Sequence, residues 1–146
     1  MCASGGRDVQ VGTVPSRQRR ARVLAVDDYA PFLILLGQVL RASAQLELLA
    51  EADSGERAIE LAEELQPDVV LMDFRLPGID GIQAARLIKT KHPSTLVILI
   101  STTAPEELPP EAGQANIDAI VWKSDLGPKR LDEIWLRYRR RQTSIG

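Results

Sequence analysis

The sequence has little that would place it outside a reducing compartment or in a membrane. Cys2 is its only cysteine, which excludes an intramolecular disulfide and favours a reducing compartment. The start of the chain has no apolar core of signal-peptide length, and the longest apolar stretch, PFLILLGQVL, is too short to span a bilayer. We therefore expect a cytoplasmic protein that makes no membrane contact.

The chain also lacks a strong overall charge, but its net charge of −2 is unevenly distributed. Residues 1–22 hold five arginines and one aspartate, and residues 129–146 hold six basic and two acidic side chains. Since each end carries +4, the stretch between them carries −10. Such an acidic body disfavours direct nucleic-acid binding in the absence of a further domain, whereas the basic ends can contact an anionic partner weakly.

With 146 residues, the chain is long enough for one domain that needs no disulfide or metal to fold. Residues 1–20 are polar and show no periodic apolar face, so we expect a disordered N-terminal extension there. The folded domain is expected over residues 21–141, followed by a short tail over residues 142–146.

Short β-rich runs alternate with helical patterns along the folded part. The expected strands are RVLAVD (22–27), LELLAEA (46–52), DVVLMD (68–73), TLVILIS (95–101) and DAIVWK (118–123). The expected helices cover residues 31–43, 55–65, 80–91, a weak one near 105–115, and 128–140. Because the strands are apolar almost throughout, both of their faces are expected to be buried. The pattern predicts an α/β fold with a five-stranded parallel sheet of order 2-1-3-4-5, a flavodoxin-like, doubly wound (βα)5 arrangement.

Polar side chains stand where four of these strands end. Asp27 and Asp28 follow the first strand, and Asp73 closes the third. Ser101 closes the fourth strand and Lys123 closes the fifth. In such a sheet, ligands bind beyond the carboxyl ends of the strands, so these side chains are expected to meet at one edge.

This convergence predicts a metal site. Three neighbouring carboxylates repel one another unless they share a cation, and a set of oxygen ligands with room for water favours magnesium over zinc. Asp73 directly follows the apolar run at 69–72, where an unpartnered carboxylate is costly to bury. We therefore expect a magnesium ion and Lys123 to neutralise it. Taken singly, the aspartates could cap a helix, Ser101 could satisfy a strand end and Lys123 could be surface charge, but these readings do not explain why all lie on one edge.

The segment from about residue 22 to 140 resembles the receiver domain of two-component response regulators. The motifs that carry the resemblance are VDDY after the first strand, LMDFRLPGIDG around the end of the third, the serine that closes the fourth and the lysine that closes the fifth. In style the chain is most similar to receivers of LuxR-type regulators, in which a serine such as Ser124 often follows the lysine.

The resemblance implies a role for each of these residues. Asp73 is implied to be the phosphoacceptor, Ser101 the switch Ser/Thr and Lys123 the phosphoryl-binding lysine. The implied magnesium ligands are Asp27, Asp28, Asp73 and the backbone carbonyl of Arg75.

The implied function is a phosphorylation-activated signalling switch. It would accept its phosphoryl group from a sensor histidine kinase or a phosphotransfer protein in a magnesium-dependent reaction. Such a domain catalyses its own phosphorylation and weakly dephosphorylates itself, and is not a conventional enzyme. The resemblance also implies a homodimer through the face formed by helix 4, strand 5 and helix 5.

Several residues depart from the family pattern. Ile120 stands where an aromatic switch residue is usual, and Trp122 lies next to Lys123 instead. Thr102 follows Ser101 where a small residue is usual, and the expected fourth helix contains Pro109, Pro110 and Gly113, which disfavour a helix. These departures leave open an alternative in which the chain is a pseudo-receiver, an adaptor that works by protein contacts without phosphorylation.

Two other classes fit the residues less well. A haloacid-dehalogenase-type phosphatase would need an aspartate two residues after Asp73, where Arg75 stands. A flavodoxin-like electron carrier would need a phosphate-binding loop after the first strand, where DDYAP would repel a phosphate.

Overall fold

The computed structural model describes residues 19–103, 105–108, 110 and 117–145. The expected disordered extension at 1–20 therefore falls almost wholly outside the described residues. Most of the weak helix expected near 105–115 also falls outside them.

The sheet is built from five parallel strands, β2 (Ala21–Val26), β3 (Leu46–Ala52), β4 (Val69–Asp73), β5 (Leu96–Ser101) and β6 (Ala119–Trp122). Their spatial order is β3-β2-β4-β5-β6, which is the predicted 2-1-3-4-5 order. Every residue of β4 and β5 is buried. This agrees with their continuous apolar sequences, since central parallel strands are covered on both faces.

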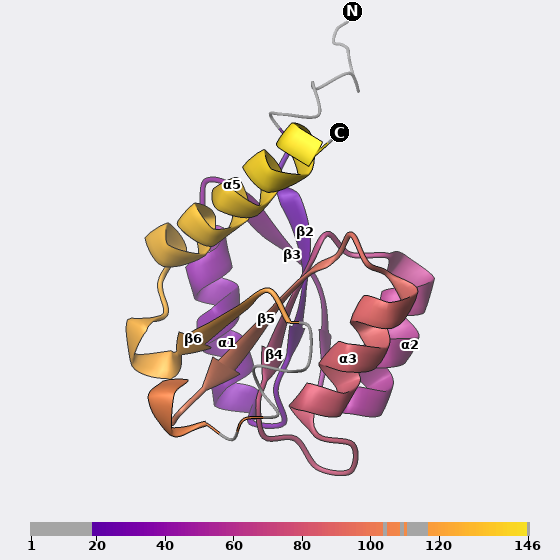
Figure 1. Ribbon diagram of the computed structural model, residues 1–146. Coiled ribbons are helices and arrows are strands. Elements are labelled where there is room, and N and C mark those ends of the chain that lie inside the picture. The colour runs from indigo at the N-terminus through magenta and orange to yellow at the C-terminus, as the bar shows by residue number, and fades with distance from the viewer. Residues whose placement is uncertain (1–18, 104, 109, 111–116, 146) are drawn as a thin grey trace, which may run out of the picture.

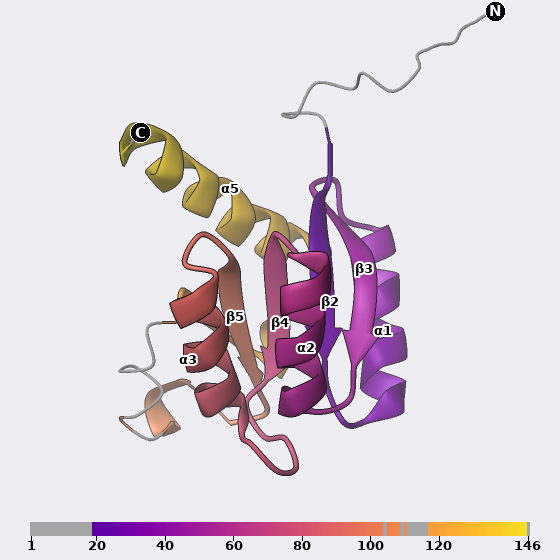
Figure 2. The same cartoon turned by 90° about the vertical axis from the view of Figure 1, so that its right-hand side faces the viewer.

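Helices cover the two faces of the sheet in pairs. α1 (Ala30–Arg41) and α5 (Pro128–Ile145) lie on one face, and α2 (Gly55–Leu65) and α3 (Gly81–Lys91) lie on the other (Figures 1 and 2). Each pair encloses its own apolar cluster, one containing Leu36 and Leu131 and the other containing Leu61 and Ile88. The strands thus separate two cores, as expected for a doubly wound sheet.

Local signals fix most helix boundaries. The Ser54 hydroxyl accepts a hydrogen bond from the amide of Arg57 at 3.1 Å, and Asp80 caps α3 in the same way through the amide of Gln83 at 2.8 Å. Gln66 takes a left-handed backbone conformation with φ of 48° directly before Pro67, which ends α2. Each of these boundaries is set by a side-chain cap or a stop within a few residues of the helix end.

The last helix is longer than expected. α5 begins at Pro128 as predicted, but it continues to Ile145 instead of ending near residue 140. No glycine or proline interrupts the sequence RYRRRQTSI, so nothing local ends the helix there. The helix therefore runs without a break through the boundary expected at 141 between domain and tail.

Two short 3₁₀ turns, η2 (Pro105–Glu107) and η3 (Lys123–Asp125), follow β5 and β6. Among the described residues, no helix combines the length and the apolar character that a membrane span requires.

A buried polar contact ties α5 to the turn between α1 and β3. The hydroxyl of Ser43, which is almost fully buried, donates to Asp132, and the same carboxylate accepts from the amides of Ala44 at 3.2 Å and Gln45 at 3.3 Å. Of these three donors the Ser43 hydroxyl is the buried one, whereas Ala44 is exposed and the amide of Gln45 also donates to Ser43 Oγ at 3.1 Å.

We predict that Asp132→Ala lowers the free energy of unfolding by about 1–3 kcal/mol, because it leaves the buried Ser43 hydroxyl without its acceptor. Urea denaturation monitored by circular dichroism measures this. Glu133→Ala is the matched control, since it removes an exposed carboxylate from the next position of the same helix. Equal effects of the two substitutions would contradict the structural role of Asp132.

Candidate functional site

Three carboxylates converge at the carboxyl edge of the sheet, as the sequence predicted. Asp27 and Asp28 follow β2, and Asp73 is the last residue of β4. One carboxylate oxygen from each lies within 4.8 Å of the others. The strands are adjacent and pair Val26 with Met72, which brings their ends to the same level. Asp27 and Asp73 are buried, whereas Asp28 is exposed.

Lys123 brings the positive charge to this cluster. Its Nζ lies 3.1 Å from Oδ2 of Asp27 and 3.9 Å from the centroid of the Phe32 ring. The ammonium is thus held between a carboxylate and an aromatic face, both of which attract a cation. The other Asp27 oxygen accepts a hydrogen bond from the amide of Tyr29 at 2.8 Å, so this fully buried carboxylate has a partner on each side.

The sequence predicts that a magnesium ion and Lys123 neutralise Asp73. In the structure the ion pair of Lys123 is with Asp27, and the charge of Lys123 lowers the pKa of Asp73 without a direct contact. Sequence reasoning also missed Phe32. Asp28 precedes the first turn of α1, so no helical spacing in the sequence links Phe32 to the aspartates.

Asp73 is held in an unfavourable electrostatic environment. Burial, followed by the nearby charge of Asp27, raises its pKa to about 6 from an ordinary value of 3.8. Lys123 and the amide of Arg75, which lies 3.4 Å from Oδ1 of Asp73, act in the opposite direction but do not compensate. The ionised form of this carboxylate therefore needs additional positive charge.

The loop after Asp73 is fixed by close backbone packing. A Cβ on Gly81 would lie 2.2 Å from the carbonyl oxygen of Asp73, so only glycine fits there without a backbone shift. Gly78 has a φ of +71° and packs against the carboxylate of Glu56. Oε2 of Glu56 also accepts a hydrogen bond from the amide of Ile79 at 3.1 Å. These contacts attach the loop that carries Arg75 to α2. The sequence analysis did not predict this role of Glu56.

Ser101 lies at the same edge of the sheet. It is buried at the end of β5, and its Oγ accepts a hydrogen bond from the amide of Thr103 at 2.9 Å. The indole Nε1 of Trp122 donates to the carbonyl oxygen of Thr102 at 3.1 Å. Trp122, which lies next to Lys123, is therefore hydrogen-bonded to the loop that follows Ser101. Ile120 is partly buried and packs against the apolar cluster beneath α2 and α3.

The donor set fits magnesium. The cluster offers three carboxylate groups beside the ammonium of Lys123, and the pKa of Asp73 is raised first by burial and then by the charge of Asp27. Hard oxygen donors, with one exposed carboxylate that leaves room for water, are the environment that magnesium prefers.

We predict that Asp73→Asn stabilises the metal-free protein at a pH well above 6. Because the folded-state pKa of Asp73 is raised, its protonated carboxyl stabilises the fold fully below pH 3.8, and this stabilisation is lost as pH rises through about 6. The shift in pKa corresponds to a loss of about 3 kcal/mol in the free energy of unfolding. Urea denaturation in the presence of EDTA at low and high pH measures the difference between wild type and variant.

Glu64→Gln is the control for this experiment, because it removes an exposed carboxylate on α2. The advantage of Asp73→Asn over wild type should grow with pH, whereas that of the control should not. A variant that is no more stable than wild type at high pH would show that ionised Asp73 does not destabilise the metal-free protein.

The chain is similar to known proteins of one family. The family model described as the response regulator receiver domain matches residues 23–134. Over 102 residues the chain is 37% identical to response regulator GacA of Pseudomonas viridiflava, a match that covers 70% of this chain and 48% of that protein.

Over 124 residues it is 33% identical to protein-glutamate methylesterase/protein-glutamine glutaminase 1 of Saccharophagus degradans, a match that covers 75% of this chain and 34% of that one. The chain thus spans only about a third to a half of the length of these curated relatives.

Solved structures share the fold. The response regulator domain of CheB from Thermotoga maritima superposes with a TM-score of 0.71 at 30% identity, covering 83% of this chain and 98% of that one. Its alignment, the family match over most of the sequence and the observed sheet order agree. This chain belongs to the response regulator receiver domain family of two-component signalling.

Proposed function

We propose that the protein is a phosphorylation-activated signalling switch that accepts a phosphoryl group on Asp73. The observation that carries this proposal is the convergence of Asp27, Asp28 and Asp73 with Lys123 at one edge of the sheet. The donor would be a sensor histidine kinase or a phosphotransfer protein. In this step a bond forms between a carboxylate oxygen of Asp73 and phosphorus, and the bond from phosphorus to the donor's histidine nitrogen breaks.

The residues present supply what phosphoryl transfer requires, which is positioning of the nucleophile and neutralisation of the phosphoryl oxygens. Asp27, Asp28, Asp73 and the backbone carbonyl of Arg75 would hold a magnesium ion. When bound, this ion supplies positive charge that favours the ionised, nucleophilic form of Asp73 and offsets charge on the phosphoryl group.

Lys123 and Ser101 would hold the phosphoryl group once it is formed. The ammonium of Lys123 lies between Asp27 and Phe32 and can exchange Asp27 for a phosphoryl oxygen, since both are anionic acceptors. The hydroxyl of Ser101 accepts from the amide of Thr103, so its own proton is available for donation to a phosphoryl oxygen.

Trp122 gives this change a route to the protein surface. A shift of Ser101 toward the phosphoryl group would displace Thr102, whose carbonyl is bonded to the exposed Trp122 indole. Ile120 has no hydroxyl with which to exchange partners, so we propose that the Trp122 contact carries the coupling in this chain. The homodimer through the face of helix 4, strand 5 and helix 5, and a cytoplasmic location, remain predictions from the sequence.

The first test is chemical phosphorylation. Incubation with acetyl phosphate and magnesium should add one phosphoryl group, detected by intact mass, because acetyl phosphate replaces the kinase as donor. Asp73→Asn and wild type with EDTA should show no added mass. Asp53→Asn, which removes an exposed aspartate near the same edge, should be labelled like wild type. An unlabelled wild type would favour the pseudo-receiver adaptor.

The second test is metal binding without phosphate. Magnesium should raise the melting temperature, because a ligand that binds only the native state stabilises it by about 2.7 kcal/mol at one hundred times its Kd. Asp28→Ala should abolish the response, since it removes an exposed ligand without disturbing the core. Glu64→Ala should retain it. A wild-type melting temperature that ignores magnesium would argue against the metal site.

A further inference from the structure

The ammonium of Lys123 is held by two contacts of different kinds. Its Nζ donates a hydrogen bond to Oδ2 of Asp27 at 3.1 Å, and it lies over the ring of Phe32 at 3.9 Å from the ring centroid. Among the residues that the structure describes, Asp27 is its one hydrogen-bond acceptor. The Phe32 ring is therefore the contact that stays with the ammonium if Lys123 releases Asp27.

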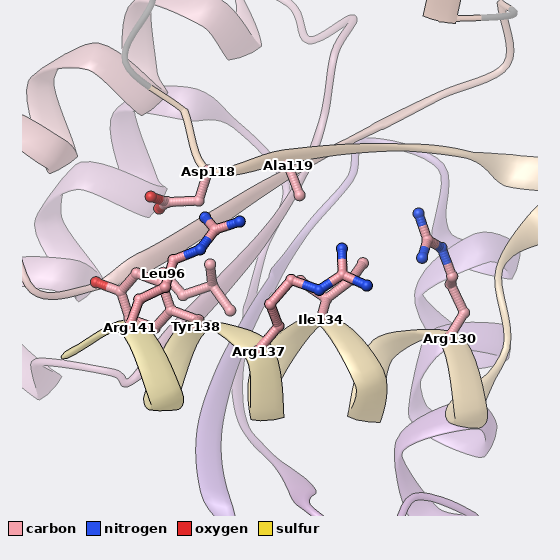
Figure 3. Close-up of a pocket in the computed structure, with 8 residues that line it drawn as sticks. All are labelled: Leu96, Asp118, Ala119, Arg130, Ile134, Arg137, Tyr138 and Arg141. Carbon is pink, nitrogen blue, oxygen red and sulfur yellow. The ribbon is translucent and has the colours of Figure 1, made fainter. Parts of the chain in front are cut away.

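The buried Lys89 shows by contrast how this fold holds an ammonium that has a structural role. Its Nζ lies 2.9 Å from Oδ2 of Asp118 and donates to two backbone carbonyl oxygens at 2.6 and 3.0 Å. The ring of Tyr138, a residue of α5 that lines a pocket beside β6 (Figure 3), has its centroid 5.5 Å away. Because an ammonium has three donors, oxygen atoms alone satisfy Lys89. Lys123 has one such partner and a much closer ring.

Asp27 and Phe32 are joined by one short turn. Oδ1 of Asp27 accepts a hydrogen bond from the amide of Tyr29 at 2.8 Å, and the carbonyl oxygen of Tyr29 accepts one from the amide of Phe32 at 3.0 Å. Pro31 restricts the backbone of the first turn of α1 further. The Phe32 side chain is buried in the apolar cluster of α1 and α5. The ring therefore keeps its place beside Asp27 whether or not Lys123 is paired with that carboxylate.

The order of the strands places Asp73 between the two partners of this ion pair. β4, which ends at Asp73, lies next to β2, which Asp27 follows, and β6, which Lys123 follows, lies beyond β5 on the other side. A phosphoryl group on Asp73 would thus form at the part of the edge that the Lys123 side chain crosses. A lysine side chain has many rotamers, so a fixed ring limits the positions that its ammonium can take.

We propose that Phe32 is a positioning residue for Lys123, whose ammonium its ring keeps at the site while Lys123 exchanges Asp27 for an oxygen of the phosphoryl group. This role depends on the phosphoryl transfer to Asp73 proposed above. The ring attracts the ammonium through its quadrupole and not through a hydrogen bond, so the ammonium can turn from one anion to the other without losing the ring. The exchange breaks one hydrogen bond to a carboxylate oxygen and forms one to a phosphoryl oxygen, and no proton is transferred.

A role of Phe32 in core packing alone predicts a different result. Its ring belongs to the apolar cluster of α1 and α5, so a smaller side chain would also loosen that cluster. Leu36 lies one turn later on the same helix and is fully buried in the same cluster. Leu36→Val is therefore the matched control, because it removes apolar volume from this cluster and leaves both partners of the Lys123 ammonium in place.

The first measurement is the rate of labelling of the full chain by acetyl phosphate and magnesium, followed by intact mass, with circular dichroism to confirm that each variant is folded. Phe32→Leu should be labelled about three- to tenfold more slowly than wild type, the factor that corresponds to the loss of a cation–π contact. Phe32→Tyr, which retains a ring, and Leu36→Val should be labelled at close to the wild-type rate. Equal rates for Phe32→Leu and wild type, or equal losses in Phe32→Leu and Leu36→Val, would overturn the proposal.

The second measurement locates the ammonium directly in wild type. In protein with 13C-labelled lysines, the NMR signal of the ε-methylene protons of Lys123 should be shifted upfield, because the ammonium bonded to that carbon lies over the Phe32 ring. The upfield shift should persist when magnesium and beryllofluoride, a mimic of the phosphoryl group, are added. Phe32→Leu should remove it, whereas the signal of Lys89, which lies near the Tyr138 ring, should not change.

The outcomes separate the role of Phe32 from the proposed function. A Lys123 signal at the ordinary position, or one that returns there when beryllofluoride binds, would show that the ring does not retain the ammonium. A wild type that is labelled while Phe32→Leu is labelled equally fast would refute the role of Phe32 alone. A wild type that neither accepts a phosphoryl group nor responds to beryllofluoride would refute the proposed function, and the role of Phe32 with it.

Discussion

The site depends on keeping two buried carboxylates, Asp27 and Asp73, within a few ångströms of each other. Buried like charges repel strongly, and one ammonium cannot neutralise both. The fold assigns Lys123 to Asp27, supported by the Phe32 ring, and leaves Asp73 undercompensated with a pKa of about 6. The ionised form of such a carboxylate is stabilised by any positive charge that arrives, a property that suits the phosphoacceptor role proposed for Asp73.

The surrounding structure maintains this unfavourable arrangement. Asp73 ends the central strand β4, in which the four preceding residues are fully buried, so its backbone cannot move into solvent. The next loop is held by the close approach of Gly81 to the Asp73 carbonyl and by the contact of Glu56 with the amide of Ile79. Packing energy from the two apolar clusters thus offsets the electrostatic strain at the edge of the sheet.

The molecule also separates its charges by position. The carboxyl edge of the sheet is acidic, whereas Arg130, Arg137 and Arg141 lie along α5 beside β6. Between them, β6 ends at Trp122 beside the acidic edge and begins beside Asp118, which is bound to Lys89 of α3. One short strand therefore borders both the acidic edge and the arginines of α5.

Sequence alone determined the fold and the composition of the site. Continuous apolar strands alternating with capped helices specify a doubly wound parallel sheet, because these are local patterns with a fixed period. The sheet order then places Asp27, Asp28, Asp73, Ser101 and Lys123 at one edge, because carboxyl ends of parallel strands share it.

The tertiary structure decided how those residues pair. The choice of Asp27 as the partner of Lys123, the support from Phe32 and Glu56, and the bond between Trp122 and Thr102 join residues far apart in the chain. Such contacts depend on side-chain directions and distances after packing, to which no local period in the sequence corresponds.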